Sequence, residues 1–263
     1  MAKYHSKLVD KQGYVDWDDE EHQVWTTLVS RQIPLVEQRA CQPYIEGLKS
    51  LALPMDSVPQ LPAINAVLQQ TTGWRCAPVP ALINFDRFFA LLADKQFPVA
   101  TFLRHRDEMD YLQEPDYFHE IFGHCAMLTH PDFAAFTAAY GKLGLNASHE
   151  ERVFLARLYW FTVEFGLLKE GDKLKIYGGG ILSSPAESVY ALESDQAERQ
   201  LFSVLDVLRT PYRIDILQPI YFYLQDIADL YRLSQADLRR KVQEAKQLGL
   251  FAPKFEPKES VHA

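Results

Sequence analysis

The architecture of this chain depends on the segment Pro115-Asp116-Tyr117-Phe118-His119-Glu120-Ile121-Phe122-Gly123-His124. It contains two histidines five residues apart, with a carboxylate beside the first, among aromatic and aliphatic side chains. Neutral imidazole is the commonest protein ligand for zinc and iron. Zinc hydrolases place their histidines closer together, as His-Glu-x-x-His, so that both lie on one face of a regular helix. The spacing here departs from that zinc-hydrolase signature.

The spacing of His119 and His124 predicts an irregular helix. On a regular α-helix, five residues turn about 140° beyond a full rotation, so the two rings would diverge. One extra residue in the helical ladder, a π-bulge, would bring them onto one face, and such bulges are frequent at functional sites. Gly123, which bends easily, lies where the distortion is needed. We therefore expect a π-type irregularity near Phe122 and Gly123; two unrelated histidines are the alternative.

The composition favours a globular protein without membrane segments. The 263 residues allow one large domain or two small ones, and 48% hydrophobic residues are enough for a sizeable core. The net charge is −8 without a Lys/Arg block, which argues against nucleic acid or an anionic membrane as a partner. The N-terminus has no apolar signal region, and no apolar run approaches the ~18 residues of a membrane span. The three cysteines, Cys41, Cys76 and Cys125, indicate buried free thiols in a reducing cytoplasm.

Helical patterns dominate the chain. Helix starts of capping-box type are predicted at Asp18 with Glu21, Ser148 with Glu151, Ser184 with Glu187 and Ser234 with Asp237. We expect the first helix to be interrupted or ended by Pro34, the Ser148 helix to run to about Leu168, and residues 221–231 to be helical. Strand-like stretches are few and short. We therefore predict a mainly α fold (α+β with a few short strands), with a polar arm at residues 1–15 and one domain at residues 16–263.

A single carboxylate, Glu164, interrupts the apolar stretch from Tyr159 to Gly166. Burying an ionised carboxylate without a partner is unfavourable, so it must form an ion pair, become protonated or bind a metal. An ion pair with Arg157 or Arg104 is one alternative. Two histidines and one carboxylate form the facial triad of non-haem iron oxygenases. A catalytic zinc site uses the same ligand types, so the ligands alone do not identify the metal.

Several motifs follow one another between about Val15 and about Tyr231. They are Pro59-Gln60-Leu61, Thr72-Gly73-Trp74, Arg104-His105, Glu114-Pro115-Asp116, His119-Glu120-x-x-Gly123-His124, Tyr159 to Gly166, Tyr177-Gly178-Gly179-Gly180-Ile181-Leu182-Ser183-Ser184, and Gln218-Pro219. In this order they resemble the pterin-dependent aromatic amino acid hydroxylases, most closely the bacterial phenylalanine 4-hydroxylases. The resemblance implies a helical, basket-like catalytic domain around Fe(II) held by His119, His124 and Glu164. Tetrahydrobiopterin or a related reduced pterin would supply two electrons.

The resemblance also implies a place for the pterin. Phe88 would stack on the pterin ring, and the backbone around Leu82 and Ile83 would bond its edge. A phenylalanine at such a helical position is ordinarily part of the core. Glu120 would face the pterin, directly or through a water molecule.

For the substrate, the resemblance implies that Arg104 holds the carboxylate, for which a guanidinium fork is well suited. The alternative for Arg104 is a surface position. Trp160, Gly180 and Ser183 would line the amino acid pocket, although Ser183 could instead belong only to a helix-start turn. The position of Ile214 is apolar in phenylalanine hydroxylases and acidic in tyrosine hydroxylases. An apolar residue there predicts a preference for phenylalanine, because a buried polar group beside an unsubstituted ring would be left unpaired.

Other residues are expected to act indirectly or to depart from the family. Tyr159 would orient the iron ligands, and Glu187 is explained as a capping-box residue outside the site. Leu112-Gln113 stand before Glu114 where the family usually has Thr-Pro, which leaves part of the substrate pocket undefined. The chain has room for neither the N-terminal regulatory domain nor the C-terminal tetramerising helix of the animal enzymes. A cytoplasmic monomer or weak homodimer is expected.

The predicted function is an iron- and tetrahydropterin-dependent monooxygenase that converts L-phenylalanine to L-tyrosine with O2. One alternative is a hydroxylase of tryptophan or tyrosine. Another is a zinc hydrolase with Glu120 as general base toward a metal-bound water. A non-catalytic metal-binding or interaction protein is the third. Metal analysis and a pterin-dependent hydroxylation assay with the three amino acids would separate them.

Overall fold

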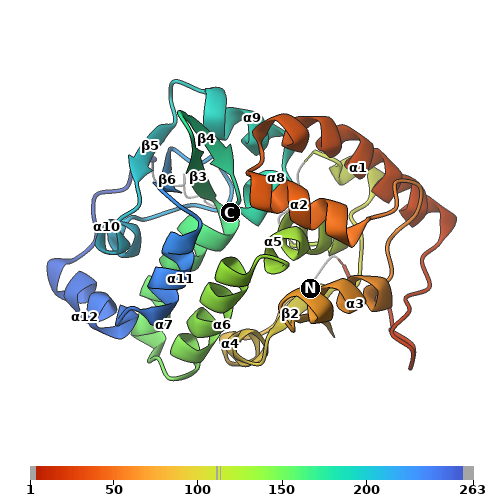
Figure 1. The fold of residues 1–263 in the computed structure, drawn as a ribbon, viewed down its shortest axis with the longest axis horizontal. Helices are drawn as coiled ribbons and strands as arrows, with labels where there is room; N and C mark the ends of the chain where they lie inside the picture. Colours follow the sequence, from red (N-terminus) through yellow and green to blue (C-terminus); the bar gives the residue numbers. More distant parts are fainter. Residues whose placement is uncertain (1–3, 111, 113, 257–263) are drawn as a thin grey trace, which may run out of the picture.

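The computed structural model describes residues 4–110, 112 and 114–256 (Figure 1). Its α-helices are α1 (Asp19–Arg39), α2 (Gln42–Leu51), α3 (Leu61–Thr71), α4 (Phe85–Ala93), α5 (Ala126–Leu128), α6 (Pro131–Leu145), α7 (His149–Tyr159), α8 (Gly179–Leu182), α9 (Pro185–Glu193), α10 (Val204–Arg209), α11 (Ala228–Gln235) and α12 (Leu238–Leu248). A 3-10 helix, η1 (Arg106–Glu108), and two π-helices, η2 (His119–Cys125) and η3 (Trp160–Glu164), complete the helices of the described residues. The strands are β1 (Arg75–Val79), β2 (Gln96–Ala100), β3 (Gly166–Glu170), β4 (Lys173–Ile176), β5 (Glu198–Leu201) and β6 (Ile220–Leu224). The predicted class, mainly α with a few short strands, is confirmed.

Two of the predicted capping boxes form as expected. Asp18 accepts a hydrogen bond from the Glu21 backbone and Glu21 accepts one from the Asp18 backbone, and Ser148 and Glu151 do the same at the start of α7. The expectation for Pro34 was wrong, since α1 continues through it to Arg39. A proline removes one helical hydrogen bond, and burial of the apolar face of α1 compensates for that loss. The buried residues of this face are Val24, Trp25, Leu28, Val29, Gln32 and Val36.

Three other predicted helices were wrong in their extent. The segment after Ser148 is helical only to Glu164, through α7 and η3, and then forms strand β3. Residues 220–224 form strand β6 before α11 begins. The last helix begins with Asp237 as its N-cap, because Ser234 still belongs to α11. The misassigned strands pair in parallel with partners far away in the sequence, and a local helical pattern does not reveal such pairing.

Four strands form one sheet, in the order β4-β3-β6-β5. β3 pairs antiparallel with β4 and parallel with β6, and β5 pairs parallel with β6. A separate parallel pair joins β1 to β2. The four-stranded sheet lies at the upper left of Figure 1, with α10, α11 and α12 below it. Because β3 starts two residues after Glu164, the sheet anchors the end of η3.

The π-helix η2 passes through the centre of the core. Ile121, Phe122 and Cys125 are fully buried, and Phe118 stacks on Phe122 with ring centroids 4.9 Å apart. Full burial of one such apolar side chain contributes roughly 1.5–3 kcal/mol. The three cysteines are buried and free, as predicted. Cys76 and Cys125 lie with their sulfur atoms 3.6 Å apart.

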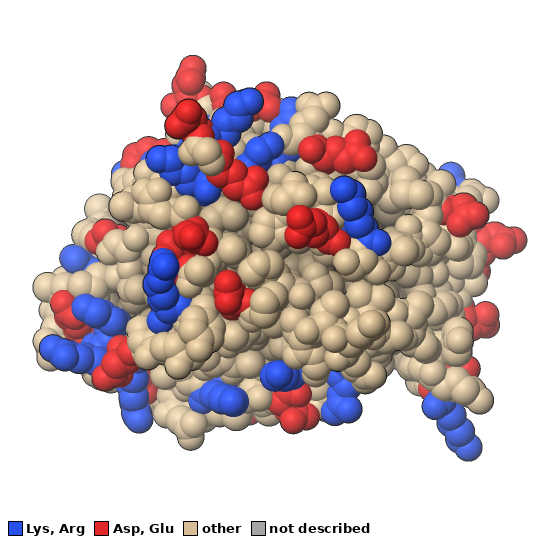
Figure 2. Space-filling view, in the orientation of Figure 1, with Lys and Arg blue, Asp and Glu red and all other residues tan. Residues whose placement is uncertain are grey.

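The surface carries no concentration of one charge on the face shown in Figure 2. Acidic and basic side chains are mixed there around a broad uncharged area. This distribution fits a sequence without a Lys/Arg block. Among the described helices, none is both long enough and apolar enough to cross a membrane.

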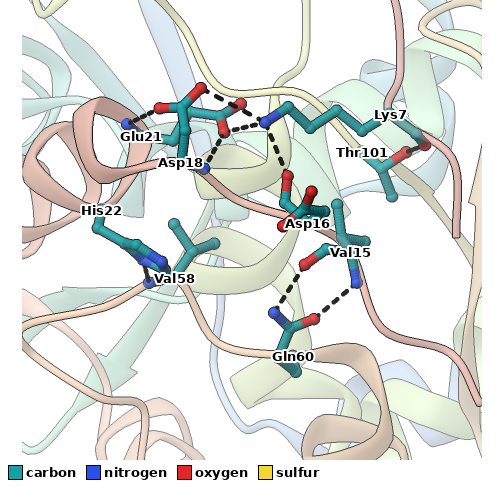
Figure 3. A network of polar contacts seen from close by, with 9 residues as sticks. All are labelled: Lys7, Val15, Asp16, Asp18, Glu21, His22, Val58, Gln60 and Thr101. Carbon is teal, nitrogen blue, oxygen red and sulfur yellow. Dashed lines mark hydrogen bonds and ion pairs between the residues drawn. The ribbon is translucent and has the colours of Figure 1, made fainter. Parts of the chain in front are cut away.

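The arm from residue 4 to residue 15 packs against the rest of the chain. The Lys7 backbone N–H donates to the Thr101 carbonyl at 2.8 Å, and the Thr101 hydroxyl donates back to the Lys7 carbonyl at 2.7 Å (Figure 3). The Gln60 side chain bonds both backbone groups of Val15, each at 2.9 Å (Figure 3). Tyr4 is 5% exposed. The arm is therefore held by hydrogen bonds and burial together.

Candidate metal centre and active site

Three predicted ligands converge on one point. Nε2 of His119 and Nε2 of His124 are 3.1 Å apart, and Oε2 of Glu164 lies 3.3 Å from the latter and 3.7 Å from the former. Two atoms in adjacent coordination positions, each ~2.1 Å from one ion, lie about 3.0 Å apart. The three atoms therefore fit one face of an iron coordination sphere with little adjustment. The opposite face remains for other ligands.

The predicted irregular helix is confirmed, because η2 is a π-helix over the whole interval from His119 to Cys125. The two imidazoles approach edge to face, with ring centroids 4.8 Å apart. A π-helix shifts the backbone pairing, and the Tyr44 hydroxyl donates to the Phe122 carbonyl at 2.8 Å. Glu164 ends a second π-helix, η3, where we had expected a regular helix.

Ser183 orients the first predicted ligand, His119. Its Oγ lies 2.9 Å from His119 Nδ1 and donates to the Gly179 carbonyl at 2.9 Å. The serine oxygen therefore accepts the Nδ1 proton, and His119 Nε2 is left with its lone pair directed at the metal position. Burial lowers the pKa of His119 to about 4, so the ring is neutral at physiological pH, as a ligand must be.

The glycines between Tyr177 and Ile181 lie against the ligands. A Cβ on Gly179 would stand 2.4 Å from Nδ1 and Cε1 of His124, and one on Gly123 would stand 2.6 Å from the Gly179 carbonyl. Only glycine permits this approach. Gly179 and Gly180 begin helix α8.

Two buried carboxyl groups, Glu120 and Glu164, lie close enough to the histidines to be the third metal ligand. One ligand atom of Glu120 lies within 4.8 Å of those of His119 and His124, so proximity alone does not exclude it. Burial raises the pKa of Glu120 well above its usual range, and the neighbouring charge of Glu164 adds to this. Burial also favours a raised pKa for Glu164, but His124 and His119 outweigh it and the net shift is downward. The opposite directions of the two pKa shifts favour the ionised form of Glu164, which suits a cation, and the protonated form of Glu120.

Arg104 is neither on the surface nor paired with Glu164. It is 7% exposed, and its Nε and Nη2 donate to the two carboxylate oxygens of Asp116 at 2.8 and 2.9 Å. Asp116 also accepts the His119 backbone N–H at 3.0 Å. Burial opposes ionisation of Asp116, but Arg104 outweighs it and lowers the pKa of this carboxyl. One edge of the guanidinium is thereby occupied, and the Nη1 edge remains for a second carboxylate. Sequence reasoning had missed Asp116.

The residues assigned to the pterin lie at and just before α4. Phe88 is half-buried and meets Tyr159 edge to face, with centroids 5.4 Å apart. Leu82 is 69% exposed and Ile83 is partly exposed. Tyr159 directly precedes η3 and packs against Tyr140. This group therefore presents apolar surface close to the helix that ends in Glu164.

The residues predicted to line the substrate pocket do not all lie in one buried site. The Trp160 ring stacks between Phe165 and Tyr212, with centroid distances of 4.3 and 4.4 Å. A Cβ on Gly180 would stand 3.1 Å from Glu164 Oε2, so this glycine lies directly at the ligand. Ile214 is 51% exposed, so the position expected to be buried is open to solvent. Gln113 lies outside the described residues. Leu112 packs against a small buried cluster that consists of Tyr4, Ala100 and Phe102.

The explanation of Glu187 as a capping-box residue was incomplete. Ser184 accepts the Glu187 backbone N–H, but the Glu187 carboxylate accepts the Tyr221 hydroxyl and the Gln218 backbone N–H instead. Glu187 is 5% exposed, and burial raises its pKa. The Gln218 side chain in turn accepts a hydrogen bond from Trp160 Nε1 at 3.1 Å. Glu187 is thus connected to a predicted pocket residue.

Comparison with known proteins agrees with the site geometry. Residues 2–249 match the model of the biopterin-dependent aromatic amino acid hydroxylase family. The chain is 63% identical to phenylalanine-4-hydroxylase of Vibrio cholerae over 263 residues, which cover 100% of this chain and 91% of the relative. It is 58% identical to that of Pseudomonas aeruginosa over 259 residues, 98% of each chain.

Solved structures agree as well. The apo cold-active phenylalanine hydroxylase of Colwellia psychrerythraea matches with a TM-score of 0.94 and 55% identity, over 96% of this chain and 98% of that one. The Chromobacterium violaceum phenylalanine hydroxylase with bound oxidised Fe(III) matches with a TM-score of 0.88 and 37% identity, over 96% and 94% of the two chains.

Proposed function

This chain belongs to the biopterin-dependent aromatic amino acid hydroxylase family, and we propose that it converts L-phenylalanine to L-tyrosine with O2 and a reduced pterin. The observation that supports this most is the convergence of His119, His124 and Glu164 within 3.1–3.7 Å of one another. Relatives of 58–63% identity that are named phenylalanine-4-hydroxylase favour phenylalanine over tryptophan or tyrosine, and hydroxylation over hydrolysis.

When bound at His119, His124 and Glu164, iron activates O2 with electrons from the pterin. The groups around the three ligands orient them and the bound pterin. Ser183 holds His119 in the tautomer that presents Nε2. Glu120, next to the first ligand, faces the pterin as a buried acid. Ligands held in this way bind their metal more firmly than unsupported ones.

Arg104 binds the substrate carboxylate through its Nη1 edge. Asp116 fixes the other edge and also accepts the His119 backbone N–H, so it connects the carboxylate site to the start of η2. The distance between the bound carboxylate and the iron is therefore set by a short, buried network. When the reactants are held in a fixed geometry, less translational and rotational entropy has to be lost in the reaction step.

The aromatic ring of the substrate lies against Trp160, Gly180 and Ile214. Phe88 would stack on the pterin ring, and the backbone around Leu82 and Ile83 would bond its edge. The exposed apolar surface at Leu82 supports this assignment, because a bound ring would cover it.

The remaining assignments concern the whole chain. Residues 16–263 form the catalytic domain, and residues 1–15 are its arm. The protein acts in the cytoplasm as a monomer or weak homodimer, and its partners are L-phenylalanine, O2 and the pterin. The buried free thiols of Cys41, Cys76 and Cys125 support a reducing compartment.

The test is a hydroxylation assay on purified protein loaded with Fe(II). Tetrahydropterin, O2 and each of the three aromatic amino acids are supplied separately, and products and pterin oxidation are measured. We expect tyrosine from phenylalanine in step with pterin oxidation, and no such product from zinc-loaded protein. Absence of tyrosine, or better turnover of tryptophan, would overturn the assignment.

A further inference from the structure

Gln218 is a buried side chain that joins two parts of the chain next to the site. It is 1% exposed and stands just before β6. Its amide nitrogen donates to the backbone carbonyls of Arg213 and Ile216, each at 2.8 Å. Its amide oxygen accepts the Trp160 Nε1–H at 3.1 Å. One amide thus connects the segment of residues 211–217 to the indole of Trp160.

The indole lies in an aromatic stack that the segment completes. Trp160 is the first residue of η3, the π-helix that ends at Glu164. Its ring is stacked on Phe165 on one side and on Tyr212 on the other, at interplanar angles of 27° and 14°. Because Tyr212 belongs to the segment, a shift of the segment would move one layer of the stack.

Hydrogen bonds from Gln218 help to hold this segment, two of whose apolar side chains are exposed. Residues 211–217 form neither helix nor strand, and Ile214 and Leu217 are 51% and 42% exposed. Gln218 is itself held from behind, since its backbone N–H donates to Glu187 Oε1 at 3.1 Å. The Tyr221 hydroxyl donates to the same oxygen. The path from Glu187 through Gln218 to Trp160 is therefore continuous and buried for most of its length.

We propose that Gln218 is a specificity-determining residue, which positions the segment of residues 211–217 against Trp160 and so sets the width of the pocket for the substrate ring. The inference rests on the proposed function, since it takes Trp160 and Ile214 as lining the amino acid pocket. Gln218 acts through these neighbours and is a positioning residue.

The test uses Gln218→Met, which keeps the length of the side chain and removes its amide. For the iron-loaded variant, kcat and KM are measured with L-phenylalanine and with L-tryptophan, together with the KM for the pterin and the iron content. We expect the KM for phenylalanine to rise about three- to tenfold, as the loss of about one net hydrogen bond would predict. We also expect the preference for phenylalanine over tryptophan in kcat/KM to fall by about threefold or more. Iron content and the KM for the pterin should stay at wild-type values.

A matched control separates positioning from general destabilisation. Gln60 also uses its amide to hold backbone, at Val15, but it lies at the start of α3 (Figure 3). Gln60→Met should lower the melting temperature without changing the preference between the two amino acids. A double-mutant cycle with Trp160→Phe, which removes the indole N–H, should show non-additive effects on that preference.

The outcomes separate the inference from the function on which it rests. A wild-type protein that forms no tyrosine would contradict the proposed function itself. If the wild type is active and Gln218→Met behaves like Gln60→Met, with additive effects in the cycle, the positioning role is wrong. Should Gln218→Met fail to fold, Gln218→Glu keeps an oxygen for Trp160 and loses both donated hydrogen bonds. The same shift in preference is then expected of that variant, and an unchanged preference would refute the proposal.

Discussion

Glu164 and Glu120 are buried beside the same two histidines, but their surroundings shift their pKa values in opposite directions. The pKa of Glu164 is lowered by His124 and His119 against the effect of burial, whereas that of Glu120 is raised by burial. Glu164→Ala should therefore reduce iron affinity by more than the ~10–100-fold typical of losing a supporting hydrogen bond to a ligand. Iron content after dialysis and tyrosine formation with added Fe(II) would measure this loss and its partial rescue.

Glu120→Gln is the matched comparison, because it keeps the size of the side chain and changes only its acid group. Iron should stay bound, and tyrosine formation should be slower or less well coupled to pterin oxidation. A hydrolase that lost its general base would instead slow by roughly 10²–10⁴-fold. If Glu120→Gln loses its metal while Glu164→Ala retains it, the two carboxylates have been assigned the wrong way round.

The pKa of His119 predicts how acid affects the metal-free protein. In the folded state the pKa is lowered, mainly by burial, from 6.5 to about 4. Between these values the unfolded chain binds the extra proton, so the free energy of unfolding rises with pH and stability is lost as the pH falls from 6.5 toward 4. Glu120 acts in the opposite direction, because its raised pKa lets the folded protein hold a proton that the unfolded chain has lost. The contribution of His119 is therefore measured as the difference between wild type and His119→Ala in urea unfolding of metal-free protein at pH 7.5, 5.5 and 4.5. This difference should change, against the wild type, by on the order of 1–3 kcal/mol from pH 7.5 to pH 4.5.

His119→Ala is the control for this pH dependence. The lowered pKa values of Asp116 and Glu164 matter only at lower pH, since both groups are normally ionised above about 4.5. Relative to the wild type, the variant should therefore gain stability as the pH falls from 6.5 to 4.5. A difference in stability between wild type and variant that stays constant over this range would show that His119 does not contribute to the pH dependence.

Residues could be predicted from the sequence where their role depends on local spacing. The two histidines stand in one short segment, and their five-residue separation was enough to predict the π-helix. Glu187 was misjudged because its side-chain partners, Gln218 and Tyr221, lie 31 and 34 residues away. Local sequence explains its backbone as part of a helix start but contains nothing about those distant partners.

At the scale of elements, the close contact between α8 and η2 leaves no space for a side chain at position 179. A Cβ on Gly179 would lie 2.4 Å from the His124 ring, which cannot move without leaving the metal position. Gly179→Ala should therefore lower iron affinity by roughly tenfold or more, because the second ligand is displaced. Metal titration of the metal-free variant would measure it.

The control is Gly171→Ala, in the turn between β3 and β4. Gly171 has φ +60°, so a side chain there is strained, but its Cβ would meet no atom within 4 Å. The variant should lose about 1–2 kcal/mol of stability and bind iron normally. If Gly179→Ala also binds iron normally, η2 and α8 can move apart without a loss of iron affinity, and the prediction is wrong.

Helices could be predicted from the sequence where the residues at their own ends mark the boundary. The capping boxes at Asp18 and Ser148 mark true helix starts, because both partners stand within three residues. Strand β6 was taken for helix because its identity depends on pairing with β3 and β5, more than 15 residues away in the sequence. The aromatic residues of β6 fit a buried helix as well as a strand until those partners are known.

At the scale of the whole molecule, the arm joins distant parts of the domain near the substrate site. Tyr4 stacks on Phe102 with ring centroids 4.7 Å apart, and its hydroxyl accepts the His105 backbone N–H at 3.2 Å. Ser6 donates to the Val79 carbonyl at 2.9 Å. Phe102 and His105 stand on either side of Leu103 and Arg104, so the arm supports the irregular segment after β2 that carries Arg104.

A variant that begins at Asp10 should therefore lose both stability and substrate affinity. It gives up the burial of Tyr4, worth roughly 1.5–3 kcal/mol, and the hydrogen bonds to Thr101. The melting temperature should fall by about 5–10 °C, since 1 kcal/mol corresponds to roughly 2–4 °C in a chain of this size. The KM for phenylalanine should rise because Arg104 is less firmly placed. Iron content should stay at the wild-type value, because Ser6 and the Lys7 backbone bond Val79 and Thr101, which lie outside η2. Leu8→Ser is the control, since Leu8 is 93% exposed and its replacement should change neither quantity. A truncated protein with wild-type melting temperature and KM would show that the arm only covers the surface on which it lies.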